Sequence, residues 1–158
     1  MRIAITGASG LIGTALTDSL RRDGHDVLTF VRRAARNDNE IAWSPETGEL
    51  DIARLEGVDA VVHLAGAGVG DRRWTPAYKR TILQSRVDGT ALIARSVAAA
   101  GVPVLISGSA MGYYGDTASA AVDESSPKGT GFLADVVAAW EAAAQPAIDA
   151  GVRVAFIR

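Results

Sequence analysis

Short apolar runs alternate with stretches of helical periodicity along the whole chain. Runs that are apolar throughout are typical of strands buried on both faces of a parallel sheet. They predict strands over residues 2–6, 27–31, 40–43, 58–64, 102–107 and 152–157. Apolar residues at helical spacing predict helices over residues 11–23, 76–100 and 131–150, with a weak helix at 51–56. Strands that alternate with helices pair in parallel through right-handed crossovers, so the pattern predicts an α/β fold with a doubly wound parallel sheet.

The same periodicity predicts which helix faces are buried and where helices end. Gly24 follows the first helix and is expected at its C′ position, while Pro76 is expected in the first turn of the second helix. Pro146 is expected to kink or tighten the last turn of the third. The predicted buried face of the first helix consists of Leu11, Ile12, Ala15, Leu16, Ser19 and Leu20. That of the third consists of Leu133, Val136, Val137, Trp140, Ala144 and Ile148.

A glycine-rich turn joins the first strand to the first helix. It reads Thr6-Gly7-Ala8-Ser9-Gly10-Leu11-Ile12-Gly13, a G-x-x-G-x-x-G spacing. Glycines there permit a tight turn, a close approach of the backbone to a pyrophosphate, and close helix–strand packing. The phosphates then meet free N–H groups at the positive end of the helix dipole. This turn predicts a Rossmann-type dinucleotide site whose cofactor contacts include Gly7, Ser9, Gly10, Leu11, Ile12 and Gly13.

The end of the second strand indicates which dinucleotide binds. An NAD site has Asp or Glu roughly 20 residues beyond the glycines, where the carboxylate accepts from the ribose 2′-OH. The chain instead has Arg32 and Arg33 after Val31. Guanidinium groups suit a 2′-phosphate, so the sequence favours NADP over NAD. The alternative is that both arginines are solvated loop residues.

Several motifs together resemble the atypical, epimerase-like branch of the extended short-chain dehydrogenase/reductase superfamily. They are Thr6–Gly13, His63–Gly66, Asp88–Thr90 and Ser107–Asp116, with Trp43–Gly48, Arg73-Trp74, Gln84–Arg86, Gly131–Asp135 and Trp140-Glu141 beside them. The resemblance spans essentially the whole chain. It implies that residues 1–158 are the Rossmann N-terminal part of a longer chain whose substrate-binding C-terminal portion is absent; with the two arginines, this part is expected to be an NADP-binding domain.

The resemblance also implies further site residues. Leu64, Ala65, Gly66 and Ser107 are expected near the cofactor, and Arg86 either holds a phosphate or carboxylate or is an ordinary helix-surface charge. Ser109 matches the superfamily's catalytic serine. The superfamily pairs that serine with Tyr-x-x-x-Lys, in which the lysine lowers the pKa of the tyrosine.

This chain departs from that catalytic pattern. Phe132 and Val136 stand where the tyrosine and lysine belong, and none of the three tyrosines has a lysine four residues later. Tyr113 and Tyr114 follow Ser109 and are the candidate proton donors; the alternative is that they only pack. Asp135 is expected to be a solvated helix carboxylate, the alternative being an acid or base, and His63 and Trp140 are expected to be core residues.

Composition narrows the classes of protein that remain. The chain has 158 residues, 48% of them hydrophobic and 22% charged, and a net charge of −2, which gives no basic surface for nucleic acid or anionic membrane. It has no cysteine, its two histidines have no metal-ligand spacing, and no apolar run is long enough for a membrane span. A cytoplasmic protein with a small-molecule substrate is expected, as a monomer or homo-oligomer. Two functions remain open: an NADP-dependent oxidoreductase or epimerase-like enzyme, and a non-catalytic NADP(H)-responsive regulator or scaffold.

Overall fold

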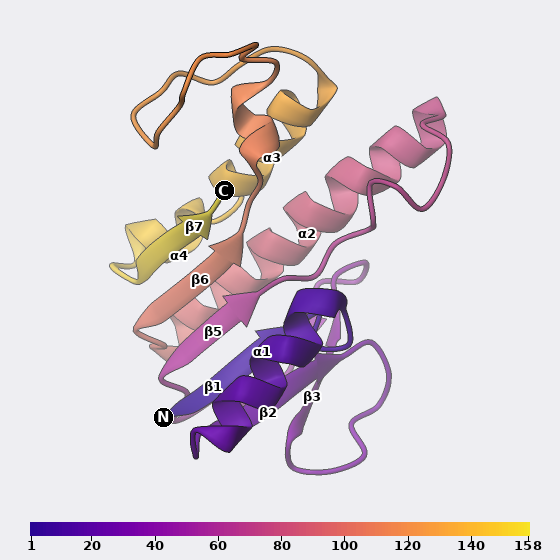
Figure 1. Cartoon of the computed structure of the whole chain (residues 1–158). Helices are drawn as coiled ribbons and strands as arrows, with labels where there is room; N and C mark the ends of the chain where they lie inside the picture. The colour runs from indigo at the N-terminus through magenta and orange to yellow at the C-terminus, as the bar shows by residue number, and fades with distance from the viewer.

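A seven-stranded sheet with the order β4-β3-β2-β1-β5-β6-β7 forms the centre of the computed structural model, which describes residues 1–158 (Figure 1). The strands are β1 (Arg2–Thr6), β2 (Asp26–Val31), β3 (Glu40–Ser44), β4 (Glu49–Leu50), β5 (Ala60–His63), β6 (Val104–Gly108) and β7 (Arg153–Ile157). Neighbouring strands pair in parallel except β3 and β4, which form an antiparallel hairpin. The chain winds outward from β1 in both directions, which confirms the predicted doubly wound Rossmann-type sheet.

Helices cover both faces of this sheet (Figure 1). They are α1 (Leu11–Arg22), η1 (Ile52–Leu55), α2 (Pro76–Ala100), η2 (Met111–Tyr114), α3 (Phe132–Ala142) and α4 (Gln145–Asp149). On one face, Leu16 and Leu20 of α1 pack against Ile3 and Ile5 of β1. The opposite face carries the larger core, in which strand residues meet side chains of α2 and Ala147 of α4. The central strands β1 and β5 are buried on both faces, as the apolar runs predicted, whereas the edge strand β7 has no buried residue.

The predicted buried face of α1 is wrong at its N-terminal end. Leu11 is 93% and Ile12 67% exposed, and Ala15 is exposed as well, whereas Gly13 and Thr17 are buried. A Cβ on Gly13 would overlap the carbonyl oxygen of Gly7. The helix start therefore lies too close to the glycine loop for a large side chain, and its apolar contacts begin one turn later at Leu16.

The predicted helix over 131–150 is two helices. α3 ends at Ala142, and α4 begins at Gln145 with Pro146 in its first turn. Proline lacks the N–H that a continuing helix needs and its ring collides with the preceding turn, so the helix restarts instead of kinking. As a result Ala147 is buried, and Ile148, predicted to be buried, is 42% exposed.

Other local predictions are confirmed. Gly24 follows the C-cap of α1 with a φ of 79°, a left-handed conformation that glycine adopts without strain. Pro76 opens α2 behind Thr75, whose hydroxyl accepts from the N–H of Tyr78. No helix of the protein combines the length and the apolar composition that a membrane crossing requires.

Candidate functional site

The glycine loop lies at the switch point of the sheet, between β1 and the segment that follows β5. Gly7 has a φ of 69°, and a Cβ on it would lie 2.9 Å from the carbonyl carbon of Leu64. The N–H of Gly10 donates back to the Gly7 carbonyl at 2.9 Å and closes the turn. Because backbone surrounds Gly7 and Gly13 so closely, these positions admit only glycine in this conformation.

The N-terminus of α1 is open to an external acceptor. Its N-cap residue, Gly10, has no side chain that could accept from the helix N–H groups, and the first turn contains no acidic residue. Free N–H groups at a helix N-terminus, with the positive end of the helix dipole, bind phosphate. The loop and helix therefore fit the pyrophosphate of a dinucleotide.

A cleft of about 1260 Å³ opens beside this loop, larger than the roughly 300–1,000 Å³ of most small-molecule pockets. Of the residues predicted to contact the cofactor, eight line it: Gly7, Ser9, Gly10, Arg32, Arg33, Leu64, Ala65 and Gly66. The other five do not line it: Leu11, Ile12 and Gly13, which form the first turn of α1, and Arg86 and Ser107. Polar residues that the sequence did not single out also line it, among them Arg21, Glu46, Asp71, Arg72, Tyr78 and Ser85.

A buried hydrogen-bond network fixes one wall of the cleft. The Thr6 hydroxyl accepts from the backbone N–H groups of Leu64 and Ala65 at 3.0 and 3.1 Å. With both lone pairs occupied, it donates its proton to Nδ1 of His63, 2.7 Å away. His63 is therefore neutral with its proton on Nε2, and this Nε2 has no partner. Burial lowers the pKa of His63 to about 4, and the prediction of a core histidine is confirmed.

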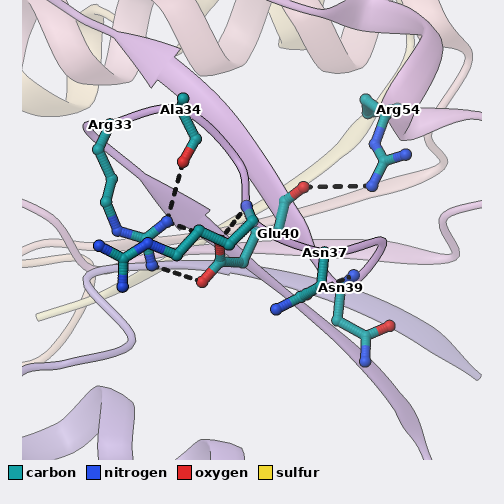
Figure 2. A network of polar contacts seen from close by, with 7 residues as sticks. Arg33, Ala34, Asn37, Asn39, Glu40 and Arg54 are labelled. Carbon is teal, nitrogen blue, oxygen red and sulfur yellow. Dashed lines mark hydrogen bonds and ion pairs between the residues drawn. The ribbon is translucent and has the colours of Figure 1, made fainter.

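The two arginines after β2 have different surroundings, and Figure 2 shows those of Arg33. Arg33 binds the Glu40 carboxylate through two hydrogen bonds, Nη1 to Oε2 at 2.7 Å and Nη2 to Oε1 at 2.6 Å. The backbone N–H of Arg36 donates to the same carboxylate at 2.8 Å. Arg32 is exposed, and its side chain makes no hydrogen bond or ion pair within the protein. Both residues line the cleft.

Arg86 lies behind the cleft wall rather than in it. Its Nη1 donates to the carbonyls of Ala67 and Ile82 at 2.9 and 3.1 Å, and its guanidinium lies 5.0 Å from the Trp140 ring centroid. Burial lowers the pKa of Arg86. The guanidinium thus fixes the loop after β5, and Trp140 is the core residue that was expected.

The three candidate catalytic residues meet in a second cluster at the carboxyl ends of β6 and β7. Ser109 Oγ donates to Oε1 of Glu141 at 2.6 Å, and Glu141 accepts two hydrogen bonds from Arg158, each 2.8 Å long. Arg158 also donates to the Tyr114 hydroxyl at 3.2 Å and lies 3.7 Å from the centroid of the Tyr113 ring. Ser107 is fully buried and donates only to the Gly108 carbonyl.

Electrostatics keep Glu141 ionised. Burial by itself raises the pKa of Glu141, but hydrogen bonds from Arg158 and Ser109 outweigh it, and the net pKa is lowered. The same carboxylate and the Tyr114 hydroxyl raise the pKa of Arg158. Sequence reasoning noted Glu141 only as half of a Trp-Glu pair and missed Arg158. The one signal for Arg158 was that it directly follows the last strand. Because β7 pairs in parallel with β6, the residues that follow the two strands come together.

Aromatic packing replaces the usual tyrosine. Phe132 contacts Trp74 edge to face with centroids 5.4 Å apart, and Lys79 Nζ lies 5.0 Å from its ring centroid. Val136 is 3% exposed. Asp135 is exposed and pairs with Lys128 at 2.7 Å, as expected of a solvated carboxylate. No proton-transferring group therefore occupies the positions of the superfamily's tyrosine and lysine.

Comparisons with known proteins agree with this fold and site. An epimerase family protein of Mycobacterium bovis is 49% identical over 156 residues, which cover 99% of this chain and 52% of that protein. A nucleoside-diphosphate sugar epimerase from Corynebacterium glutamicum matches 100% of this chain and 33% of its own, with a TM-score of 0.87 and 40% identity. Human epimerase family protein SDR39U1, whose structure contains NADPH, matches 91% of this chain and 48% of its own, with a TM-score of 0.79 and 32% identity.

The chain spans about half the length of the curated relatives it matches. Residues 3–138 match the model of the NAD dependent epimerase/dehydratase family. The resemblance found in the motifs is thereby confirmed, and the chain belongs to the NAD dependent epimerase/dehydratase family.

Proposed function

We propose that this protein binds NADP(H) in the cleft beside the glycine loop, in preference to NAD(H). The observation that carries the proposal is the open N-terminus of α1 in a cleft that Arg32 and Arg33 also line. Two guanidinium groups supply charge-assisted hydrogen bonds to a 2′-phosphate. The NADPH in the structure of human SDR39U1 supports the same choice.

Fluorescence titration of NADPH and NADH into the full-length protein tests this preference. NADPH is expected to bind at least about tenfold more tightly, a difference of about 1.4 kcal/mol. Replacing both Arg32 and Arg33 by alanine should remove most of the difference and leave NADH binding unchanged. Equal affinities in the unmodified protein would refute the assignment.

The activity we propose is that of an oxidoreductase or epimerase-like enzyme acting on a sugar-type or other small hydroxylated substrate. A bound nicotinamide supplies or accepts a hydride at a substrate carbon. The protein must then exchange a proton with the substrate oxygen, and Ser109 with Tyr113 or Tyr114 is the group proposed to do so. The similarity to the nucleoside-diphosphate sugar epimerase of Corynebacterium glutamicum supports a sugar-type substrate.

The second cluster has the chemistry for this exchange. The Ser109 hydroxyl donates its hydrogen bond to the Glu141 carboxylate, which leaves the lone pairs of the serine oxygen free to accept from a substrate hydroxyl. Arg158 donates to the Tyr114 oxygen, so this hydroxyl's own proton remains available to an external acceptor.

Single substitutions separate catalysis from packing. In the full-length protein, Tyr113→Phe or Tyr114→Phe should lower kcat by roughly 10²–10⁴, the usual contribution of general acid/base catalysis. NADPH affinity should remain nearly unchanged, because other residues carry binding. If both variants keep full activity, the tyrosines only pack.

A thiol probe tests the cluster without any substrate. Residues 1–158 contain no cysteine, so Ser109→Cys introduces the only thiol in this part of the protein. The adjacent Glu141 carboxylate should raise the pKa of this thiol, and adding Glu141→Gln should lower it again, measured by alkylation rate against pH. An unchanged pKa would show that Glu141 does not act on position 109.

The second candidate function is a non-catalytic NADP(H)-responsive regulator or scaffold. Phe132 and Val136, packed where tyrosine and lysine are usual, favour it. Tight NADPH binding with no turnover across a panel of sugar nucleotides and small carbonyl compounds would support this function over the enzymatic one.

A further inference from the structure

The loop from Arg32 to Asn39 leaves β2 and returns as β3, and Glu40 is the first residue of that strand. Its backbone is fixed by the sheet, since Glu40 stands in register with Thr29 of β2. Its side chain is 14% exposed, against 41% for that of Arg33. The sheet therefore fixes the position of the Glu40 carboxylate, and the carboxylate in turn fixes the more exposed Arg33 side chain.

Glu40 holds Arg33 by one edge of the guanidinium only (Figure 2). A guanidinium is planar and carries five N–H bonds. One Nη1–H and one Nη2–H bind Glu40, and the other Nη1–H is directed to the Ala34 carbonyl at 2.9 Å. The Nε–H and the second Nη2–H remain, and they lie together on the other edge. This pair makes no hydrogen bond within the protein and matches the bidentate geometry by which arginine binds phosphate.

Glu40 itself does not line the cleft. Arg33 lines the cleft, whereas Glu40 lines a separate hollow with Arg36, Asp38, Asp51 and Arg54. Hydrogen bonds from Arg33 and from the Arg36 backbone occupy the carboxylate oxygens and lower the pKa of Glu40 to about 2. Although acidic and close to the end of β2, Glu40 is thus not placed to accept from a ribose 2′-OH as the acid of an NAD site does.

We propose that Glu40 is a positioning residue for cofactor selectivity: it clamps Arg33 by one guanidinium edge and directs the other edge toward the 2′-phosphate of NADP(H). The proposal rests on the proposed NADP(H) binding and adds the residue that pre-organises it. Arginine loses much side-chain freedom when it is fixed on a ligand. A clamp that fixes the side chain before binding removes that cost from the binding step.

The alternative is competition, in which Glu40 neutralises Arg33 and weakens phosphate binding. Titrations of NADPH and NADH into the full-length protein separate the two. With a positioning role, Glu40→Ala weakens NADPH binding by roughly fivefold and leaves NADH unchanged. Glu40→Gln, which keeps one acceptor, has a smaller effect. With competition, both variants bind NADPH more tightly, and that result, or an unchanged NADPH affinity, overturns the proposal.

Two controls make the experiment specific to the clamp. In the Arg33→Ala background, Glu40→Ala should have no further effect on the NADPH affinity, because Glu40 acts only through Arg33. Asp38→Ala removes a neighbouring acid whose side chain is fully exposed and pairs only with Arg54, and it should leave both affinities unchanged. NADH binding by each variant shows that the fold is intact. Equal affinities of the unmodified protein for NADPH and NADH would refute NADP(H) selectivity itself. If the unmodified protein prefers NADPH but Glu40→Ala binds it no more weakly, only the role of Glu40 is refuted.

Discussion

Acidification from about pH 7.5 to pH 5 is expected to destabilise the fold through His63. The ring is fully buried, and burial lowers its pKa from the ordinary 6.5 to about 4. When the pKa of a base is lower in the folded than in the unfolded protein, its contribution to stability is fully present at any pH above the unfolded pKa. That stabilisation is lost as the pH falls from 6.5 toward 4, because the unfolded chain binds the proton first.

The expected magnitude follows from these two pKa values. The difference between the two pKa values lowers the free energy of unfolding by about 3 kcal/mol once the pH is below both values. About 2 kcal/mol of this loss has occurred by pH 5. Protonation would also place a hydrogen on Nδ1, which must accept from the Thr6 hydroxyl. Glu40 titrates only at lower pH, so its stabilisation is still present in this window.

Urea unfolding at several pH values measures the effect. His63→Asn places an amide oxygen near the position of Nδ1 and cannot titrate. Between pH 7.5 and 5, the free energy of unfolding of this variant should fall by about 2 kcal/mol less than that of the unmodified protein. His25→Asn removes the other, partly exposed histidine as a matched control and should keep the pH dependence of the unmodified protein. Identical pH dependence in the unmodified protein and His63→Asn would refute the reasoning.

Three further predictions concern single positions. Gly13→Ala should abolish NADPH binding or unfold the protein, because a Cβ overlaps the Gly7 carbonyl; Gly70→Ala, with open space around it, should do neither. Gly101→Ala, also in open space but with a φ of 68°, should cost about 1–2 kcal/mol in urea unfolding. Glu141→Gln should cost about 2 kcal/mol by the same measurement, since Arg158 loses its counter-charge; no change would show that the pair contributes no stability.

Local sequence patterns predicted much of the fold and the glycine-loop part of the candidate site. Apolar runs that alternate with helical periodicity predicted the parallel sheet, because a strand that is buried on both faces has to be apolar throughout. Gly24 and Pro76 were predictable because a left-handed C′ residue and a first-turn proline are local backbone requirements. The loop from Gly7 to Gly13 indicated the dinucleotide site for the same reason. Each of these features is decided within a few residues of its own sequence.

Tertiary structure decided the features that depend on residues distant in sequence. Leu11 and Ile12 fit an apolar helix face, but the close approach of Gly13 to Gly7 turns them outward. Glu40 resembles a solvated acid until β3 pairs with β2 and brings it to Arg33. Ser109, Glu141 and Arg158 come from three elements and meet because β6 and β7 end side by side beneath α3. Periodicity reports only which face of an element is apolar, whereas sheet order and helix approach determine which polar groups become neighbours.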